Sequence, residues 1–189
     1  MENIKETITE LLMSTNRPGM DKLIQHMEEN GFFTAPCSTQ YHLAVDGGLA
    51  KHSLNVYHYA KATAFSIDPE LDDASLIIVC LLHDLGKIGQ FGKPGYTENI
   101  LKSGKRSDAK PFVTNSNLLY VDHEIRSIQL ASQYIELTEQ ESFAILYHNG
   151  MYGNLKYALS DKETPLMLLV HFADMWCSRV KENEEHDEA

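Results

Sequence analysis

The chain has 189 residues and a formal net charge of -11, and 43% of its residues are hydrophobic while 23% are charged. These values fit one soluble globular domain with a sizeable core, and they argue against broad coating of nucleic acid or binding to anionic membranes. The three cysteines are far apart and form no CxxC pair, which argues against a disulfide framework or a zinc finger and fits a cytoplasmic location.

The first half of the chain is predicted to be helical, because apolar residues recur at helical spacing between clear start and stop signals. The N-terminus lacks a signal-peptide core, and no apolar stretch approaches the ~20 residues that span a bilayer, so we expect no membrane partner. Residues 31–48 are expected to form a loop. Helices are predicted over residues 3–14, from Pro18 to Asn30, from Leu49 to about Ser66, and from Ala74 to Asp84.

The second half begins with residues 86–117, a segment rich in glycine and proline that we interpret as one long loop. Thr138 and Glu141 then form a capping-box pattern at the start of a later helix. Helices are predicted from Leu118 to Ile135, from Thr138 to His148, and from Thr164-Pro165 to about Lys181. No strand alternation is evident, so the expected fold is all-α. The expected division is N-terminal helices in 1–35, a core over 41–180 and a frayed acidic tail over 182–189.

Histidines and aspartates fall on the apolar faces of several of these helices. A lone histidine on such a face is more often a packed core residue than a ligand. A buried carboxylate, however, is costly without a cation or a donor, and five segments contribute here. Imidazoles combined with carboxylates suit zinc, iron, manganese or nickel. The residues are His52, the pair His83-Asp84, His123, His148 and Asp174.

The order of these residues resembles the HD-domain superfamily, whose pattern is a histidine, a His-Asp doublet and a distant aspartate. The stretches "GGLAKHSLNV", "LLHDLGK" and "HFADMW" carry the likeness over roughly residues 41–180. The resemblance implies an HD-type helical bundle with two additional N-terminal helices, and two divalent metals, iron or manganese before nickel, zinc or magnesium. It implies one metal on His52, His83, Asp84 and Asp174, and a second on Asp84, His123 and His148, with Asp84 bridging. Members with two metals often have two consecutive histidines at the later motif, where this chain has His148 and Asn149.

Such a site suggests hydrolysis of a phosphoester, because two metals polarise a phosphoryl oxygen and lower the pKa of a water. The motifs look closest to the HD modules of bacterial 3′–5′ exoribonucleases. No OB-type nucleic-acid-binding domain accompanies them, so we expect a small anionic substrate, such as a nucleotide, and no extended nucleic-acid surface. One alternative is a diiron oxygenase acting on a small polar or phosphonate substrate, and another is a binding module without catalysis.

Two basic residues are candidates for contacting that substrate. Lys87, one turn beyond Asp84, is assigned a catalytic or substrate-binding role together with Asp84, against the alternative of a solvated lysine. Six lysines and arginines and two acidic residues between positions 86 and 117 support an anionic substrate. Arg126 either clamps a phosphate or pairs at the surface with Glu124 or Asp122. The N-terminal helices either cap the domain or form a homodimer contact.

Overall fold

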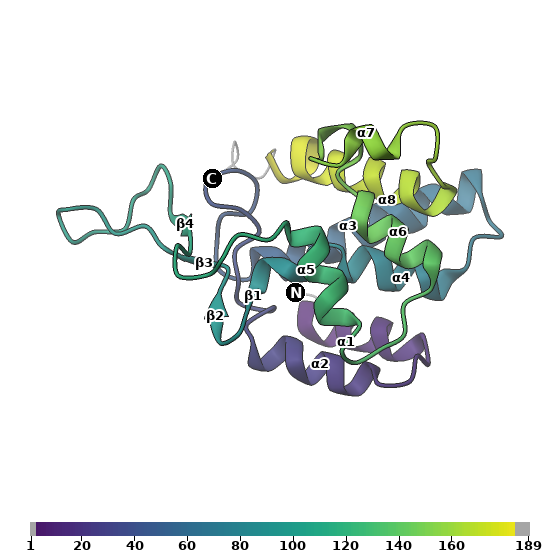
Figure 1. Cartoon of the computed structure of the whole chain (residues 1–189), viewed down its shortest axis with the longest axis horizontal. Coiled ribbons are helices and arrows are strands. Elements are labelled where there is room, and N and C mark those ends of the chain that lie inside the picture. Colours follow the sequence, from purple (N-terminus) through teal and green to yellow (C-terminus); the bar gives the residue numbers. More distant parts are fainter. Residues whose placement is uncertain (1–2, 184–189) are drawn as a thin grey trace.

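The computed structural model describes residues 3–183, and within them eight α-helices account for most of the regular structure (Figure 1). The all-α prediction is therefore confirmed. The helices are α1 (Ile4–Ser14), α2 (Met20–Glu29), α3 (Gly48–Ile67), α4 (Asp73–Leu82), α5 (His123–Ala131), α6 (Glu139–Tyr147), α7 (Lys156–Leu159) and α8 (Pro165–Trp176).

Helix α4 lies at the centre of the bundle. Its residues 76–82 are all buried, as expected for a helix that is apolar on every side. Helix α3 packs against α4 and α8, and α1 packs against α3 and α4. Ile8 and Leu12 of α1 are fully buried in the same core, so the N-terminal helices cap the domain. Figure 1 shows α1 and α2 on the opposite side of the bundle from α7 and α8.

Residues 86–117 differ from the single loop that we predicted. They contain the 3₁₀ turn Leu85–Ile88 and two antiparallel pairs, β1 (Gly89–Gln90) with β2 (Lys93–Pro94) and β3 (Tyr96–Glu98) with β4 (Phe112–Thr114). The strands have only two or three residues, which is too short for alternation to be visible in the sequence. Figure 1 shows the segment between β3 and β4 extending away from the bundle.

Helix α5 begins at His123, five residues later than predicted, and ends at Ala131. Leu119 and Tyr120 are 86% and 79% exposed, so their apolar character does not reflect a buried helical face. Asp122 instead has an extended backbone and its carbonyl accepts the first helical hydrogen bond, from the Arg126 N–H. The late start leaves residues 118–121 to line a cavity, described below.

Helix α8 continues into a π-helical turn, Cys177–Lys181. The expectation of a frayed tail from residue 182 is wrong for Glu182, which is fully buried. The rest of the expected tail, residues 184–189, lies outside the described residues. No helix between residues 3 and 183 has the length and apolar character needed to cross a membrane.

Candidate metal centre

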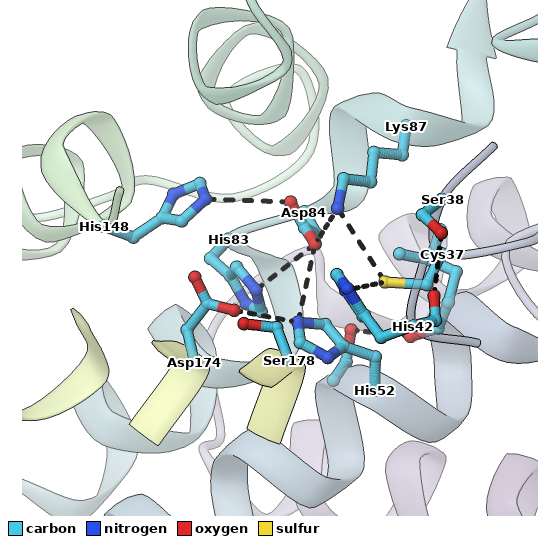
Figure 2. A network of polar contacts seen from close by, with 12 residues as sticks. Cys37, Ser38, His42, His52, His83, Asp84, Lys87, His148, Asp174 and Ser178 are labelled. Carbon is cyan, nitrogen blue, oxygen red and sulfur yellow. Dashed lines mark hydrogen bonds and ion pairs between the residues drawn. The ribbon is translucent and has the colours of Figure 1, made fainter. Parts of the chain in front are cut away.

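The side chains expected to bind metal come from five distant segments and meet at one place. Figure 2 shows His52, His83, His148 and Asp174 gathered around Asp84. Each of these residues lies either on the core-facing side of a helix or at the end of a helix. His52 lies in α3, His83-Asp84 follow α4, His123 begins α5, His148 follows α6 and Asp174 lies in α8.

Gly86 allows α5 to come close to the His83-Asp84 pair. A Cβ at this position would lie 2.2 Å from the carbonyl oxygen of His123, so no larger residue fits without moving the helix. Ser127 fixes the approach, because its hydroxyl accepts a hydrogen bond from the Gly86 N–H and lies 2.7 Å from the His83 carbonyl oxygen. This contact holds His123 beside Asp84. Gly86 therefore provides room for α5, and its backbone does not need the left-handed conformation that often ends a helix.

The two carboxylate oxygens of Asp84 face different histidines. Oδ2 lies 3.4 Å from Nε2 of His83 and 3.7 Å from Nε2 of His52. Oδ1 lies 3.1 Å from Nε2 of His123 and 3.7 Å from Nε2 of His148. Asp84 thus joins two halves of one cluster, the His52 half with His52, His83 and Asp174, and the His123 half with His123 and His148.

Backbone carbonyls fix the orientation of two of the imidazoles. Nδ1 of His83 lies 2.8 Å from the Cys80 carbonyl oxygen, and Nδ1 of His148 lies 2.8 Å from the Ile145 carbonyl oxygen. A carbonyl only accepts hydrogen bonds, so Nδ1 donates and the lone pair is on Nε2. Both Nε2 atoms therefore present a lone pair toward Asp84, which is the arrangement of metal-binding histidines.

Several atoms in the cluster are buried without a hydrogen-bond partner among residues 3–183. They are Nε2 of His52, Nε2 of His83 and Oδ1 of Asp84. Nε2 of His52 lies 3.1 Å from Oδ1 of Asp174, but not in a hydrogen-bonding geometry. Unpaired buried polar atoms are rare in folded proteins because each is costly, so their convergence here fits a cation-binding site. Imidazole nitrogens and carboxylate oxygens fit a divalent transition metal.

The protonation states of Asp84 and His148 suit a metal. Burial acts to raise the pKa of Asp84, but the Lys87 ammonium, 2.6 Å from Oδ2, and the nearby His83 hold it well below its usual value. Burial lowers the pKa of His148 to about 3. The carboxylate is therefore ionised and the imidazole neutral at physiological pH, which are the forms that coordinate metals.

The His123 half contains one feature that the His52 half lacks. The Nδ2 amide nitrogen of Asn149 lies 3.1 Å from Nε2 of His148 and 3.4 Å from Nε2 of His123. The same nitrogen donates a 2.7 Å hydrogen bond to Glu124. The amide thus contacts the two Nε2 atoms that a second metal would require.

A cavity of about 430 Å³ opens beside the His123 half, and Lys87, His123 and Arg126 line it. Arg126 is 3% exposed, and it donates hydrogen bonds to the Gln90 side chain and the Leu119 carbonyl. No carboxylate contacts its guanidinium in the described part of the chain, so the alternative of a surface pair with Glu124 or Asp122 is wrong. Burial lowers the pKa of Arg126, and no neighbouring acid opposes that effect.

Lys87 also lies between the metal cluster and the cavity. Its side chain is 14% exposed, so it is not the solvated lysine of the alternative interpretation. Its ammonium lies 2.6 Å from Oδ2 of Asp84 and 3.8 Å from Sγ of Cys37. Burial acts to lower the pKa of Lys87, but Asp84 outweighs it, and the pKa lies well above its usual value. The lysine is therefore a fixed positive charge.

Two groups of residues around the cluster were not among the ligands predicted from the sequence. Glu182 lies 3.0 Å from Nδ1 of His52, although its place in a charged C-terminal stretch suggested solvent exposure. Cys37 lies 3.3 Å from Nε2 of His42, and the His42 ring lies 5.0 Å from that of His52. The contacts of Cys37 and His42 come from the irregular segment before α3, where no periodicity predicts which side chains turn inward.

Comparison with known families identifies the chain. The family model for the HD domain matches residues 49–175, which is most of the chain and contains every candidate ligand. The chain belongs to the HD domain family. HD domains are generally metal-dependent hydrolases, so membership implies divalent metal binding and an enzyme of this broad class. A comparison with solved structures gives no significant match.

Proposed function

We propose that this HD protein is a phosphohydrolase, a phosphodiesterase or nucleotidase, that acts on a small nucleotide-like phosphoester. The observation that carries the proposal is the Asp84 carboxylate, whose two oxygens face two separate pairs of histidines. A single structural hydrogen bond would not require this arrangement. Two divalent metals sharing one carboxylate would require it.

The ligand sets follow from these contacts. His52, His83, Asp84 and Asp174 would hold the first metal, and Asp84, His123 and His148 would hold the second. Metals bound there supply Lewis acidity toward a phosphoryl oxygen and lower the pKa of a water for attack at phosphorus. Iron and manganese suit this mixture of nitrogen and oxygen ligands, which also suits nickel or zinc.

Lys87 and Arg126 are the residues proposed to bind the substrate phosphate. Both line the cavity next to His123, and both are cationic and largely buried. A buried guanidinium without an acid partner is costly, and an anionic ligand in the cavity would remove that cost. Arg126 would bind the phosphate oxygens through its remaining N–H groups. Lys87 would orient Asp84 and stabilise the negative charge that develops on the phosphoryl group.

The hairpin segment between β3 and β4 supports an anionic substrate. Lys102, Lys105 and Lys110 are exposed there, and no acidic side chain contacts their ammonium groups in residues 3–183. Tyr96 at the start of β3 lines the cavity, so the basic segment begins at its edge. In a chain with a net charge of -11, a local positive region would raise the concentration of anions near the cavity.

The test is metal content together with activity. The protein is purified from cells supplemented with iron and manganese, as wild type and as His123→Ala, and bound metal is measured per chain. We expect roughly two metals in wild type and one in His123→Ala, with hydrolysis of p-nitrophenyl phosphate esters or mononucleotides only in wild type. Oxygen consumption without hydrolysis would instead support a diiron oxygenase. Absence of metal under every loading condition would overturn the proposal.

A further inference from the structure

Glu182 is a fully buried carboxylate that contacts His52 on the side of the imidazole that faces away from Asp84. Its two oxygens lie 3.1 Å and 3.0 Å from Nδ1 of His52. The Asn55 side chain donates a 3.0 Å hydrogen bond to one of them. Glu182 touches no other candidate ligand, so whatever it does at this site acts through His52.

These contacts place the His52 imidazole between two carboxylates. Glu182 faces Nδ1, and Asp174 lies 3.1 Å from Nε2. A carboxylate accepts the Nδ1 proton, which leaves Nε2, the nitrogen that faces Asp84 and Asp174, as the atom that would bind a metal. His83 and His148 obtain the same orientation from backbone carbonyls, which carry no charge. A charged acceptor makes an imidazole a stronger metal ligand, so His52 differs from the other two.

The π-helical turn Cys177–Lys181 explains how both carboxylates reach one imidazole. In a regular α-helix, residues eight apart such as Asp174 and Glu182 point roughly 80° apart, at about 100° per residue. One additional residue in a π turn removes about 100° of that rotation, which brings the two side chains to within roughly 20° of each other. The wide turn therefore aligns Glu182 with the His52 face of α8.

We propose that Glu182 is a positioning residue that fixes the orientation and charge of His52 for metal binding in the His52 half. This inference rests on the metal centre proposed above, and it adds a residue outside the matched segment 49–175. It explains why a glutamate in a charged C-terminal stretch is buried without a lysine or arginine partner among the described residues.

The experiment compares Glu182→Gln and Glu182→Ala with Glu141→Gln. Glu141 is also fully buried, but it pairs with Arg17 far from the cluster, so its variant tests burial of a glutamate alone. Manganese affinity and metal content are measured for each folded protein. We expect Glu182→Ala to bind the first metal about 10- to 100-fold more weakly, Glu182→Gln to lie between it and wild type, and Glu141→Gln to lower only the unfolding temperature.

A second measurement separates this inference from the proposed function. In protein labelled with ¹⁵N-histidine, the Nδ1–H of His52 bonded to Glu182 should give a downfield, slowly exchanging proton resonance, with or without bound zinc. We expect that resonance in wild type and its loss in Glu182→Ala. Unchanged manganese affinity in a folded Glu182→Ala, or equal weakening in Glu141→Gln, would overturn the inference. A wild type that binds no metal but shows the resonance would overturn the proposed function and reduce Glu182 to a structural partner.

Discussion

The two halves of the cluster share Asp84 but differ in how their histidines are held. In the His52 half, His52 and His83 are fully buried, and their Nε2 atoms have no hydrogen-bond partner in residues 3–183. In the His123 half, the His123 side chain is 32% exposed, and the Asn149 amide lies within 3.4 Å of both Nε2 atoms. One half is closed to solvent at its histidines, and the other is open toward the cavity.

This difference indicates a division of roles. A buried ligand set with unpaired lone pairs has no alternative partner, so a metal there is held tightly. In the open half, a metal would have to replace the Asn149 amide at His123 and His148, and His123 lines the same cavity as Lys87 and Arg126, where a substrate would bind. We therefore expect the His52 half to hold a resident metal and the His123 half to hold a weaker one closer to the reaction.

The largest expected effect comes from removing the group that the halves share. Asp84→Asn keeps the shape of the side chain but removes the charge that faces all four histidines. We expect metal content to fall from roughly two per chain to near zero and hydrolysis to fall to background. The variant also leaves the Lys87 ammonium without its acid partner, which costs about 3 to 5 kcal/mol when the pair is buried.

Metal analysis and thermal unfolding of metal-free protein check this prediction. His52→Ala is the matched variant, because it should remove the tight metal while leaving Lys87 paired with Asp84. Retention of one tightly bound metal by a folded Asp84→Asn would show that one half binds metal without the shared carboxylate. The two halves would then not be linked through Asp84.

Sequence patterns predicted which side chains would meet in one cluster better than they predicted the surroundings of that cluster. Helical periodicity places His52 and Asp174 on buried faces, and an apolar helix that ends in two polar residues marks His83-Asp84. The long helices α3, α4 and α8 agree with their predicted ranges to within a few residues, apart from the π-helical end of α8. These features depend on local spacing, which a sequence displays directly.

The errors concern contacts between segments that are distant in the chain. The paired strands of 86–117 are too short to show alternation, and residues 118–121 are apolar because they line a cavity rather than a helix interface. Burial of Glu182 depends on a π-helical turn that has no known spacing signal in this sequence. Arg126 is buried without an acid partner in the described residues, and this burial likewise depends on α5 packing against the turn at Gly86.

A smaller effect is expected from Arg126, and it sharpens the assignment of the open half to substrate binding. Arg126→Met removes a buried charge that has no acid partner in the described residues and keeps much of the side-chain volume. We expect KM for a phosphoester to rise about 10- to 100-fold, because a charge-assisted hydrogen bond contributes roughly 1.5 to 3 kcal/mol. Stability of the ligand-free protein should stay unchanged or increase, since the charge is uncompensated.

Inorganic phosphate gives a readout for Arg126 that does not depend on catalysis. Phosphate should raise the unfolding temperature of wild type through the cavity, and this increase should be absent in Arg126→Met. Arg106→Met is the control, because that arginine is exposed and pairs with Glu98. Equal stabilisation of all three proteins by phosphate would place the anion elsewhere and remove Arg126 from the substrate site.

The smallest effect is expected from a change at Asn149. This change distinguishes the two halves most directly, because Asn149 contacts histidines of the His123 half alone. Asn149→Ala removes the amide nitrogen that contacts His123 and His148, so a second metal has one fewer internal contact to displace. A neutral hydrogen bond contributes about 0.5 to 1.5 kcal/mol, so we expect the second metal to bind roughly two- to tenfold more tightly. The affinity of the first metal should not change, because Asn149 contacts neither His52 nor His83.

Stepwise manganese titration distinguishes the two affinities. Weaker binding of the second metal in Asn149→Ala would mean that the amide is itself a ligand, and the open half would then be a more complete metal site than its contacts indicate.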